Sequence, residues 1–179
     1  TGDMALTLSR FWKGKAFIEG IDFSRELLTI AGRKTKEAGL DDKITFREGN
    51  AESLPYENGQ FDAVTITFGL RNINNRGNAL REFYRVTRPG GCFVCLEFSQ
   101  PTNQVFQGIY SFYLLNIVPF VSRLFGSHPT AYEYLGNTIK NFPPPAALAG
   151  LIESAGWKNT AYQKLAGGIV AIHTGEKAA

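Results

Sequence analysis

The stretch F-D-A-V-T-I-T-F, residues 61–68, decides the fold. It is β-branched and aromatic with almost no charge, which is typical of a central strand covered on both faces. Apolar residues at helical spacing follow it, and the turn Pro89-Gly90-Gly91 then leads into a second apolar run, residues 92–98. The order of strand, helix and strand predicts an α/β domain with a mostly parallel sheet. The residues at helical spacing are Ala79, Leu80, Phe83 and Val86.

The residues before this stretch show the same alternation of strand and helix. A short apolar run ends in the carboxylate of Asp22. Ser24 is placed to cap the helix that follows, and Gly39 stands where a glycine ends a helix. The expected elements are a helix that starts near Met4, strands over 15–22 and 43–48, and a helix over 25–38 between the strands.

The remainder of the chain departs from this alternation. Residues 159–165 and 169–174 flank Ala166-Gly167-Gly168 and predict an antiparallel hairpin. Residues 98–122 contain no charged residue, but amide side chains, glycine and proline interrupt them, which argues against a membrane span. Buried helices and an apolar lid over a substrate both remain open. We therefore assign residues 1–179 to one domain, with a helical substrate-cap insertion at about 102–142.

The composition and the net charge of the chain exclude several classes of function. A chain of 179 residues with 44% hydrophobic and 20% charged residues is typical of a globular domain. The net charge of +3 is small and scattered, so we expect no nucleic-acid partner. Two cysteines exclude a disulfide scaffold, and with two histidines they argue against a metal site. Cys92 and Cys95 match C-x-x-C, but residues three apart on a strand point to opposite faces, which excludes a local redox pair.

Ligands of doubly wound sheets bind outside the carboxyl ends of the strands. Asp22 ends a strand twenty residues after Gly2, a separation at which a carboxylate accepts both ribose hydroxyls of a nucleoside. Asn50-Ala51, after the next strand, is placed to hydrogen-bond an adenine edge. Each signal is weak alone, because Asp22 is equally suited to cap a helix. An NAD-binding domain would carry the same carboxylate, although the turn at residues 89–91 and the terminal hairpin count against it.

Five motifs follow one another along the chain. They are G-I-D-F-S (20–24), G-N-A-E-S-L-P-Y (49–56), F-D-A-V-T-I-T-F-G-L-R-N-I (61–73), Y-R-V-T-R-P-G-G (84–91) and L-E-F-S-Q-P (96–101). In this order they resemble the class I S-adenosylmethionine-dependent methyltransferases. F-G-L-R-N-I, L-E-F-S-Q-P and A-Y-E-Y-L-G-N-T-I-K-N-F-P (131–143) narrow the resemblance to the ubiquinone/menaquinone biosynthesis C-methyltransferases of the UbiE/MenG type.

The resemblance implies a Rossmann-like class I methyltransferase sheet that binds S-adenosylmethionine and needs no metal. It implies C-methylation of a polyprenylated demethylquinol, which converts demethylmenaquinol to menaquinol, and it leaves open whether the ubiquinone-pathway benzoquinol is also a substrate. The residues implied at the methyl donor are Thr1, Asp22, Asn50, Ala51 and Thr67, and we add their neighbours Gly2 and Phe23.

The main departure from the family is the beginning of the chain. Family members carry the first strand with its glycine-rich turn, and N-terminal helices, ahead of the T-G-D at residues 1–3. We read these elements as missing here, so that a natural N-terminal portion is absent or disordered. A sheet without its central first strand exposes apolar edges, so we expect these residues alone to be inactive.

Methylation of a ring carbon requires that carbon to be nucleophilic, and deprotonation of a quinol hydroxyl makes it so. Arg71 lies just beyond the strand at 61–68 and stays protonated, so it suits stabilisation of the oxyanion rather than the role of base. Asn72 is placed to orient the same oxygen, and Glu97 is a candidate base. A capping or ion-pairing role for Arg71 is the alternative. His128 titrates in the right range, but we interpret it as a surface histidine.

A polyprenylated quinol resides in the bilayer. We therefore expect a cytoplasmic protein that is peripheral at the membrane and makes transient contact with its surface. The sequence leaves open whether the protein forms a homo-oligomer. Tyr132 and Tyr134 are expected at the ring oxygens, although core packing is an equal alternative. Apolar side chains of the insertion are expected at the tail or the lipid, namely Phe112, Tyr113, Leu114, Leu115 and Phe120.

Two alternatives remain open at this point. One is a methyltransferase for another apolar small molecule, such as a sterol or lipid. The other is a scaffold subunit of a quinone-pathway assembly without catalytic activity. Binding of S-adenosylmethionine separates the scaffold from both enzymes, and a comparison of quinol and sterol substrates separates the enzymes.

Overall fold

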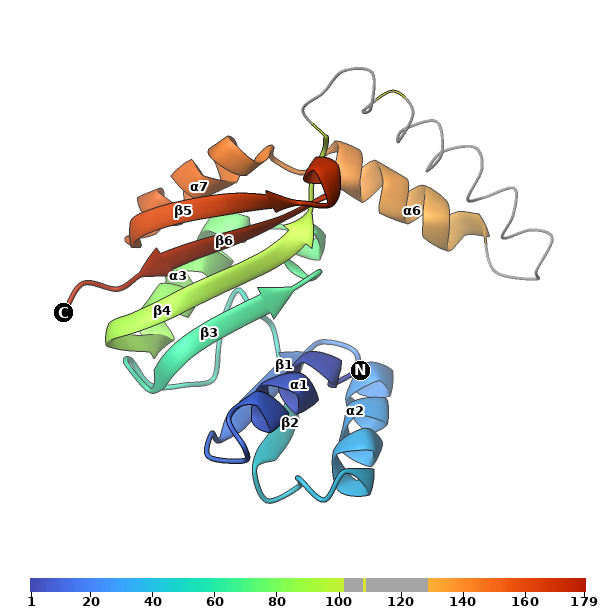
Figure 1. The fold of residues 1–179 in the computed structure, drawn as a ribbon, viewed down its shortest axis with the longest axis vertical. Coiled ribbons are helices and arrows are strands. Elements are labelled where there is room, and N and C mark those ends of the chain that lie inside the picture. The colour runs from blue at the N-terminus through green and yellow to red at the C-terminus, as the bar shows by residue number, and fades with distance from the viewer. Residues whose placement is uncertain (102–107, 109–128) are drawn as a thin grey trace. The chain divides into compact units, whose positions relative to one another are not determined.

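The protein is described by a computed structural model that covers residues 1–101, 108 and 129–179, excluding the side chains of 129–133. It divides into two compact units, residues 1–57 and 58–179 (Figure 1). Each unit has its own sheet and helices. The prediction of a single domain over 1–179 stays a prediction.

The N-terminal unit is a two-stranded parallel sheet with two helices packed against it. The strands pair in register from Ile18 opposite Ile44 to Asp22 opposite Glu48. Buried Ala5, Leu6 and Ile44 form its core. The elements are α1 (Asp3–Phe11), β1 (Ile18–Asp22), α2 (Arg25–Glu37) and β2 (Ile44–Glu48), which confirms the predicted order.

Helix α2 begins and ends where the sequence predicts. The Ser24 hydroxyl accepts a hydrogen bond from the Leu27 amide at 3.3 Å, and Gly39 follows the helix with φ +64°. Its partner α1 approaches it closely at Gly2, which has φ +78°. A Cβ at Gly2 would lie 2.9 Å from the Ala31 Cβ, so both the backbone conformation and the space require glycine there.

The C-terminal unit has a four-stranded sheet in the order β3-β4-β6-β5. The pair β3–β4 is parallel, whereas β6 is antiparallel to both β4 and β5. This mixed order confirms the predicted parallel sheet with an antiparallel C-terminal hairpin. The elements are β3 (Phe61–Thr67), the 3₁₀ turn η1 (Leu70–Asn72), α3 (Arg76–Val86), β4 (Thr87–Phe98), α6 (Pro129–Lys140), α7 (Pro145–Ser154), β5 (Lys158–Leu165), the 3₁₀ turn η3 (Ala166–Gly168) and β6 (Val170–Glu176).

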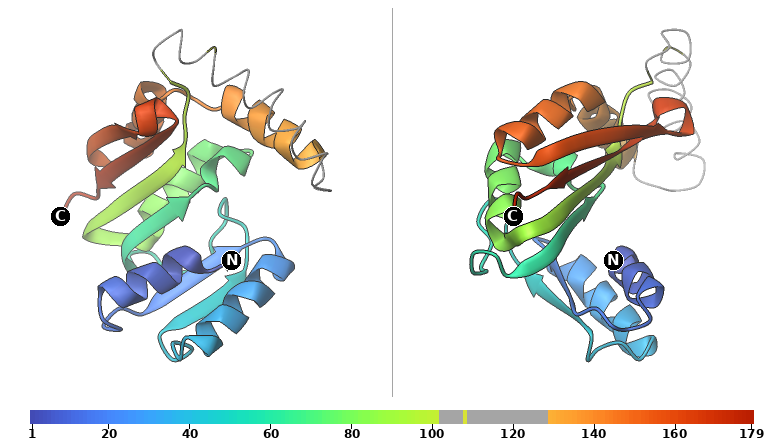
Figure 2. Two further views of the ribbon diagram at one scale, coloured as in Figure 1. Left: turned by 45° about the vertical axis from the view of Figure 1, so that its right-hand side comes forward. Right: turned by 60° about the vertical axis from the view of Figure 1, so that its left-hand side comes forward.

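Helices α3 and α7 lie side by side on one face of this sheet (Figure 2). Their core centres on Trp157, which is buried and donates from its indole nitrogen to the Leu80 carbonyl at 3.3 Å. The Trp157 ring lies 5.1 Å from that of Phe93, which in turn lies 5.7 Å from Phe83. The four residues predicted at helical spacing are all buried in α3, as an amphipathic helix requires.

Strand β3 differs from its prediction as a strand covered on both faces. In the four-stranded sheet it is an outer strand, because β4 is the strand that pairs with it within residues 58–101 and 129–179. Ala63 and Thr65 are accordingly exposed. Strand β4 also begins earlier than predicted, at Thr87, and includes the turn in which Gly90 has the expected positive φ of +75°.

The segment after β6 fastens the turn near the start of β4. The Lys177 amide donates to the Gly91 carbonyl at 2.9 Å, and the Gly90 amide donates to the Lys177 carbonyl at 2.9 Å. The Lys177 ammonium donates to the carbonyls of Tyr84 and Thr87, each at 2.7 Å. A cation at the carboxyl end of α3 also opposes the negative end of the helix dipole.

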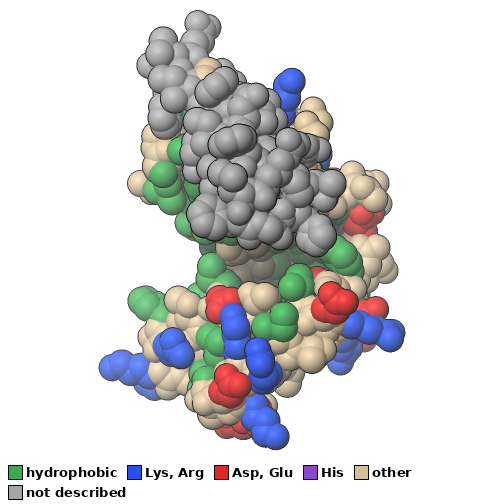
Figure 3. Space-filling view, turned by 90° about the vertical axis from the view of Figure 1, so that its right-hand side faces the viewer, with side chains coloured by type: hydrophobic (Ala, Val, Ile, Leu, Met, Phe, Trp, Pro, Cys, Tyr) green, Lys and Arg blue, Asp and Glu red, His purple; other side chains and the backbone are tan. Residues whose placement is uncertain are grey.

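Only part of the predicted insertion is described. Helix α6 lies within it, whereas Phe112, Leu115 and the other expected tail contacts lie outside the described residues. Among the residues that the structure describes, no helix has both the length and the apolar character that a bilayer crossing requires. On the face shown in Figure 3, basic and acidic side chains are interspersed, in agreement with the scattered charge in the sequence.

His173 on β6 gives the fold a dependence on pH. It is buried, its Nε2 lies 3.0 Å from the Pro145 carbonyl oxygen, and its Nδ1 has no partner among the described residues. Burial lowers the pKa of His173 below its ordinary value of 6.5, and the hydrogen bond to Pro145 opposes this in part. The neutral ring is therefore the form that the folded protein favours.

We expect the free energy of unfolding to fall as the pH drops below about 6.5, because the unfolded chain then binds the proton that His173 resists. Above that pH the contribution is fully present. Urea denaturation of the protein and of His173→Gln, between about pH 8 and pH 5, measures it. Glutamine keeps a donor for Pro145 but does not titrate. Equal pH slopes for the two proteins would contradict this role of His173.

Candidate functional site

The N-terminal unit brings Asp22 and Asn50 to one edge of its sheet. Parallel strands end at the same edge, and here the Asp22 carbonyl accepts a hydrogen bond from the Gly49 amide at 3.0 Å. The carboxylate of Asp22 and the amide of Asn50 therefore follow neighbouring strand ends. This is the arrangement expected from the sequence.

Both side chains keep polar atoms for a ligand. Oδ1 of the Asp22 carboxylate accepts a hydrogen bond from the Ser24 amide at 2.9 Å, whereas Oδ2 has no partner among the described residues. The Asn50 Oδ1 accepts the Glu52 amide at 2.9 Å, which leaves its Nδ2 as a donor without a described partner. A half-buried carboxylate oxygen and an amide N–H at one edge match the hydroxyls and ring nitrogens of a nucleoside.

The other residues expected at the donor lie in different places. Gly2 is the N-cap of α1, and the Thr1 hydroxyl donates to the Asp3 carboxylate. That bond, with the nearby Lys34 ammonium, lowers the pKa of Asp3. Phe23 is 77% exposed, and Ala51 is half-buried. Thr67 belongs to the C-terminal unit, where it ends β3 opposite Leu96.

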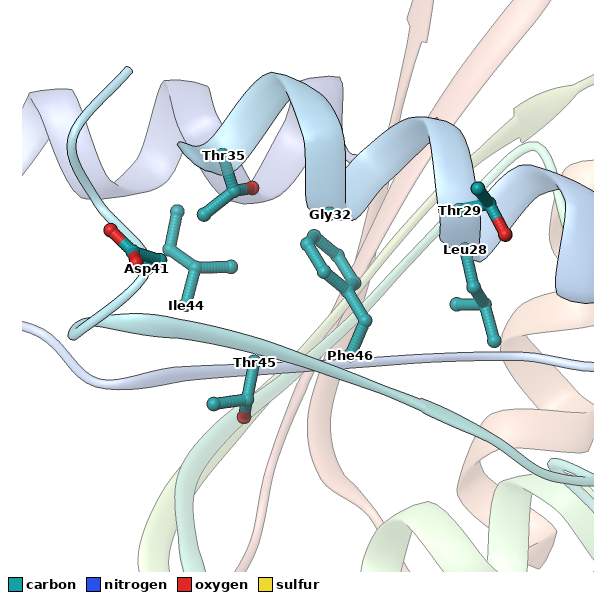
Figure 4. Close-up of a pocket in the computed structure, with 8 residues that line it drawn as sticks. All are labelled: Leu28, Thr29, Gly32, Thr35, Asp41, Ile44, Thr45 and Phe46. Atoms are coloured by element: carbon teal, nitrogen blue, oxygen red, sulfur yellow. The ribbon is translucent and has the colours of Figure 1, made fainter. Parts of the chain in front are cut away.

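A hollow in the N-terminal unit lies elsewhere (Figure 4). Side chains of α2 and β2, with Asp41 between them, surround it. No residue predicted at the donor or at the quinol lines it. The lining residues are Leu28, Thr29, Gly32, Thr35, Asp41, Ile44, Thr45 and Phe46.

The C-terminal unit joins Arg71 and Glu97. Arg71 lies in η1 just after β3, and Glu97 lies near the end of β4, so the parallel pairing of these strands places the two at one edge. The Arg71 amide donates to Glu97 Oε2 at 3.1 Å, and the guanidinium Nη1 donates to Oε1 at 2.9 Å. Their side chains are 11% and 1% exposed, so the ion pair is buried.

This pairing leaves part of the guanidinium uncommitted. Arg71 Nη1 also donates to the Phe68 carbonyl, whereas its buried Nε has no partner among the described residues. An orphaned buried donor is costly unless a ligand satisfies it. A fixed cation with a spare N–H is suited to bind an oxyanion. The alternative of Arg71 as an ion-pairing residue is thus also present in the structure, together with this spare donor.

Asn72 and Tyr134 also meet in this unit. The Tyr134 hydroxyl donates to Asn72 Oδ1 at 3.2 Å, and the Tyr134 side chain is exposed. Gln100, just after β4, holds the end of α6 by donating to the carbonyls of Ile139 and Lys140 at 3.3 and 2.8 Å. Two pairs of predicted residues therefore meet in this unit, Arg71 with Glu97 and Asn72 with Tyr134. The side chain of Tyr132 and all of His128 lie outside the described residues.

The sequence analysis missed Phe68. This residue follows β3 with φ +54°, a conformation that costs an aromatic residue about 1 kcal/mol or more. Its ring lies 4.6 Å from that of Phe98 and stays partly exposed, and the Arg71 guanidinium lies 5.2 Å from the Phe98 ring. Strained, partly exposed residues gather at functional sites, but an aromatic residue gives no sequence signal for this conformation.

Comparisons with known proteins show the fold and the family of this chain. The fold is similar to that of an S-adenosylmethionine-dependent methyltransferase from Thermotoga maritima, with a TM-score of 0.62 and 16% identity over 90% of this chain and 82% of that one. The model of the ubiE/COQ5 methyltransferase family matches residues 1–177. The fold is therefore of the methyltransferase kind, and the family model makes the chain a methyltransferase.

Two curated relatives support the family. A demethylmenaquinone methyltransferase from Mycobacterium tuberculosis is 43% identical over 97% of this chain and 70% of its own length. A ubiquinone/menaquinone biosynthesis C-methyltransferase from a Marinomonas species is 34% identical over 99% of this chain and 70% of its own length. The chain belongs to the ubiE/COQ5 methyltransferase family and is an S-adenosylmethionine-dependent methyltransferase, which confirms the resemblance of its motifs.

The two thiols are predicted to react differently. Cys92 is exposed and Cys95 is buried, which confirms that they face opposite sides of β4. Burial also raises the pKa of Cys95, so its thiol stays protonated. We expect Ellman's reagent to modify Cys92 in the folded protein and Cys95 only after denaturation. Cys92→Ser should then show no fast reaction, and fast modification of its remaining thiol would contradict the assignment.

Proposed function

We propose that this methyltransferase transfers a methyl group from S-adenosylmethionine to a ring carbon of a polyprenylated demethylquinol, with demethylmenaquinol as its main substrate. The names of the relatives at 34–43% identity support this choice. The single observation that carries it within the molecule is the buried Arg71 guanidinium, whose Nε has no partner among the described residues. The ubiquinone-pathway benzoquinol is a second substrate of the same chemistry.

The N-terminal unit is proposed to bind the nucleoside. Asp22 Oδ2 would accept the ribose hydroxyls, and Asn50 Nδ2 would donate to the adenine. Phe23, which is exposed, would cover an apolar face of the base. Gly2, Thr1, Ala51 and Thr67 complete the proposed donor contacts. The methyl donor supplies an activated sulfonium methyl, so no metal is required for this transfer.

The C-terminal unit is proposed to activate the quinol. Arg71 would bind the ring oxygen as its proton leaves, because a fixed cation lowers the pKa of a hydroxyl beside it. The guanidinium itself cannot take the proton, so a water molecule does so. Asn72 and Tyr134 would hold the ring so that the adjacent carbon reaches the methyl group in line, which accounts for much of the acceleration. The carbon gains the methyl group and then loses its own proton to solvent.

The substrate also suggests where the protein works. A polyprenyl tail keeps the quinol in the bilayer, so we propose that the protein contacts the membrane surface transiently. Phe112 and Leu115, with their apolar neighbours, remain the proposed contacts for the tail. A cytoplasmic, peripheral location follows from this proposal.

Turnover tests the function directly. We expect the protein to methylate demethylmenaquinol and to leave a panel of sterols unmethylated, as measured by mass spectrometry of the extracted quinone. Arg71→Lys keeps the charge but loses the planar fork, so kcat should fall roughly 10²–10³-fold with donor affinity unchanged. Methylation of sterols instead would identify another apolar substrate, and failure to bind S-adenosylmethionine would favour a scaffold.

The donor contacts have their own test. Asp22→Asn removes the charge with little change of shape, and loss of a charge-assisted hydrogen bond of about 1.5–3 kcal/mol should raise the Kd for S-adenosylmethionine roughly tenfold or more. Titration calorimetry measures this Kd. Ser24→Ala is the matched control, because it removes the cap hydroxyl but keeps the amide that faces Asp22. An unchanged Kd in Asp22→Asn would overturn the assignment.

A further inference from the structure

We propose that Glu97 is a positioning residue rather than the base: it holds residues 68–72, here named the 68–72 loop, so that Arg71 presents its guanidinium to the substrate. The proposal rests on the proposed function for the identity of that substrate. Its structural content, however, concerns a loop of this chain and is measurable without any substrate.

The first observation is that protein donors occupy the Glu97 carboxylate. Oε1 accepts hydrogen bonds from the Arg71 Nη1 at 2.9 Å and from the Phe98 amide at 2.8 Å. Oε2 accepts a hydrogen bond from the Arg71 amide at 3.1 Å. The residue is 1% exposed. A general base must reach the proton it takes at about 2.6–3.2 Å, directly or through one water. The carboxylate oxygens of Glu97 are instead committed to Arg71 and to the backbone.

The second observation is that the loop needs a restraint. Phe68 has φ +54°, which favours other loop conformations unless neighbouring contacts oppose them. The Phe68 amide donates to the Leu96 carbonyl at 2.8 Å, which fixes the start of the loop to β4. Glu97 fixes Arg71 to the same strand through both its backbone and its side chain.

The third observation is that different residues hold the backbone of the loop and the side chain of Arg71. Arg76 on α3 donates to the carbonyls of Leu70 and Arg71 at 3.4 and 3.0 Å, so it supports the loop backbone. Glu97 is the acidic residue paired with the Arg71 guanidinium, and that pairing sets the direction of the side chain. Removal of one partner of a buried ion pair leaves the other charge uncompensated. Loss of Glu97 should therefore release the guanidinium, while Arg76 still holds part of the backbone.

Hydrogen exchange tests the restraint independently of catalysis. In Glu97→Gln the amide side chain offers one acceptor in place of two, so exchange of the amides in the 68–72 loop should accelerate about tenfold or more. Glu82→Gln is the matched control, because it removes a Glu–Arg ion pair within α3 that does not touch the loop. Unchanged protection of the loop in Glu97→Gln would overturn the proposal.

Kinetics then separates positioning from base catalysis. A displaced guanidinium should lower kcat about 10²-fold, with the Kd for S-adenosylmethionine unchanged and the acidic limb of the pH–rate profile retained. Loss of that limb would identify Glu97 as the base and overturn the proposal. Glu97→Asp keeps the charge and should retain more activity than Glu97→Gln. If Glu97→Gln does not fold, Glu97→Asp carries the same exchange and pH tests.

Chemical rescue gives a direct readout of the pairing. In Arg71→Ala, added guanidinium ion should restore part of kcat, because Glu97 holds it where the Arg71 side chain lies. The double variant with Glu97→Gln should show no rescue, and equal rescue would contradict the role of Glu97. If the wild-type protein does not methylate demethylquinols, the proposed function fails, whereas the exchange experiment still decides whether Glu97 restrains the loop.

Discussion

The buried ion pair of Arg71 and Glu97 is the interaction on which the chemistry proposed for the C-terminal unit depends. It forms because β3 and β4 are parallel and end at the same edge, so that residues 26 positions apart in sequence meet there. Burial makes the pair costly to break and gives the guanidinium one direction. Nη1 is committed to Glu97 and Phe68, whereas Nε has no partner within the described part of the chain and is the atom proposed to bind the substrate oxygen.

The two units carry different chemistry. The N-terminal unit ends its strands in a carboxylate and an amide, groups that suit a sugar and a base. In the C-terminal unit a cation and an amide follow β3 and a phenol comes from α6, and these groups suit an oxygenated ring. Membership in the ubiE/COQ5 methyltransferase family supplies the reaction for which these groups are proposed, the transfer of a methyl group from S-adenosylmethionine.

Much of this arrangement could be predicted from local sequence patterns. Ser24, Gly39 and Gly90 act through the backbone within a few residues of themselves, so a short motif suffices to place them. Asp22 and Asn50 could be predicted to share an edge because parallel strands always end together. Arg71 could likewise be placed just beyond β3 from its position in the sequence, but its contacts could not.

Other features depend on partners that no local pattern specifies. The left-handed Phe68 is maintained by contacts to β4, and Glu97 could be read as a base until its three donors were located. Gln100 likewise binds the end of α6, which lies about forty residues later in the sequence.

The contacts of Lys177 with the turn near the start of β4 have a practical consequence. If carboxypeptidase digestion removes Lys177, or a fusion partner replaces it, its bonds to Gly90 and Gly91 are lost, and the start of the strand that carries Glu97 is loosened.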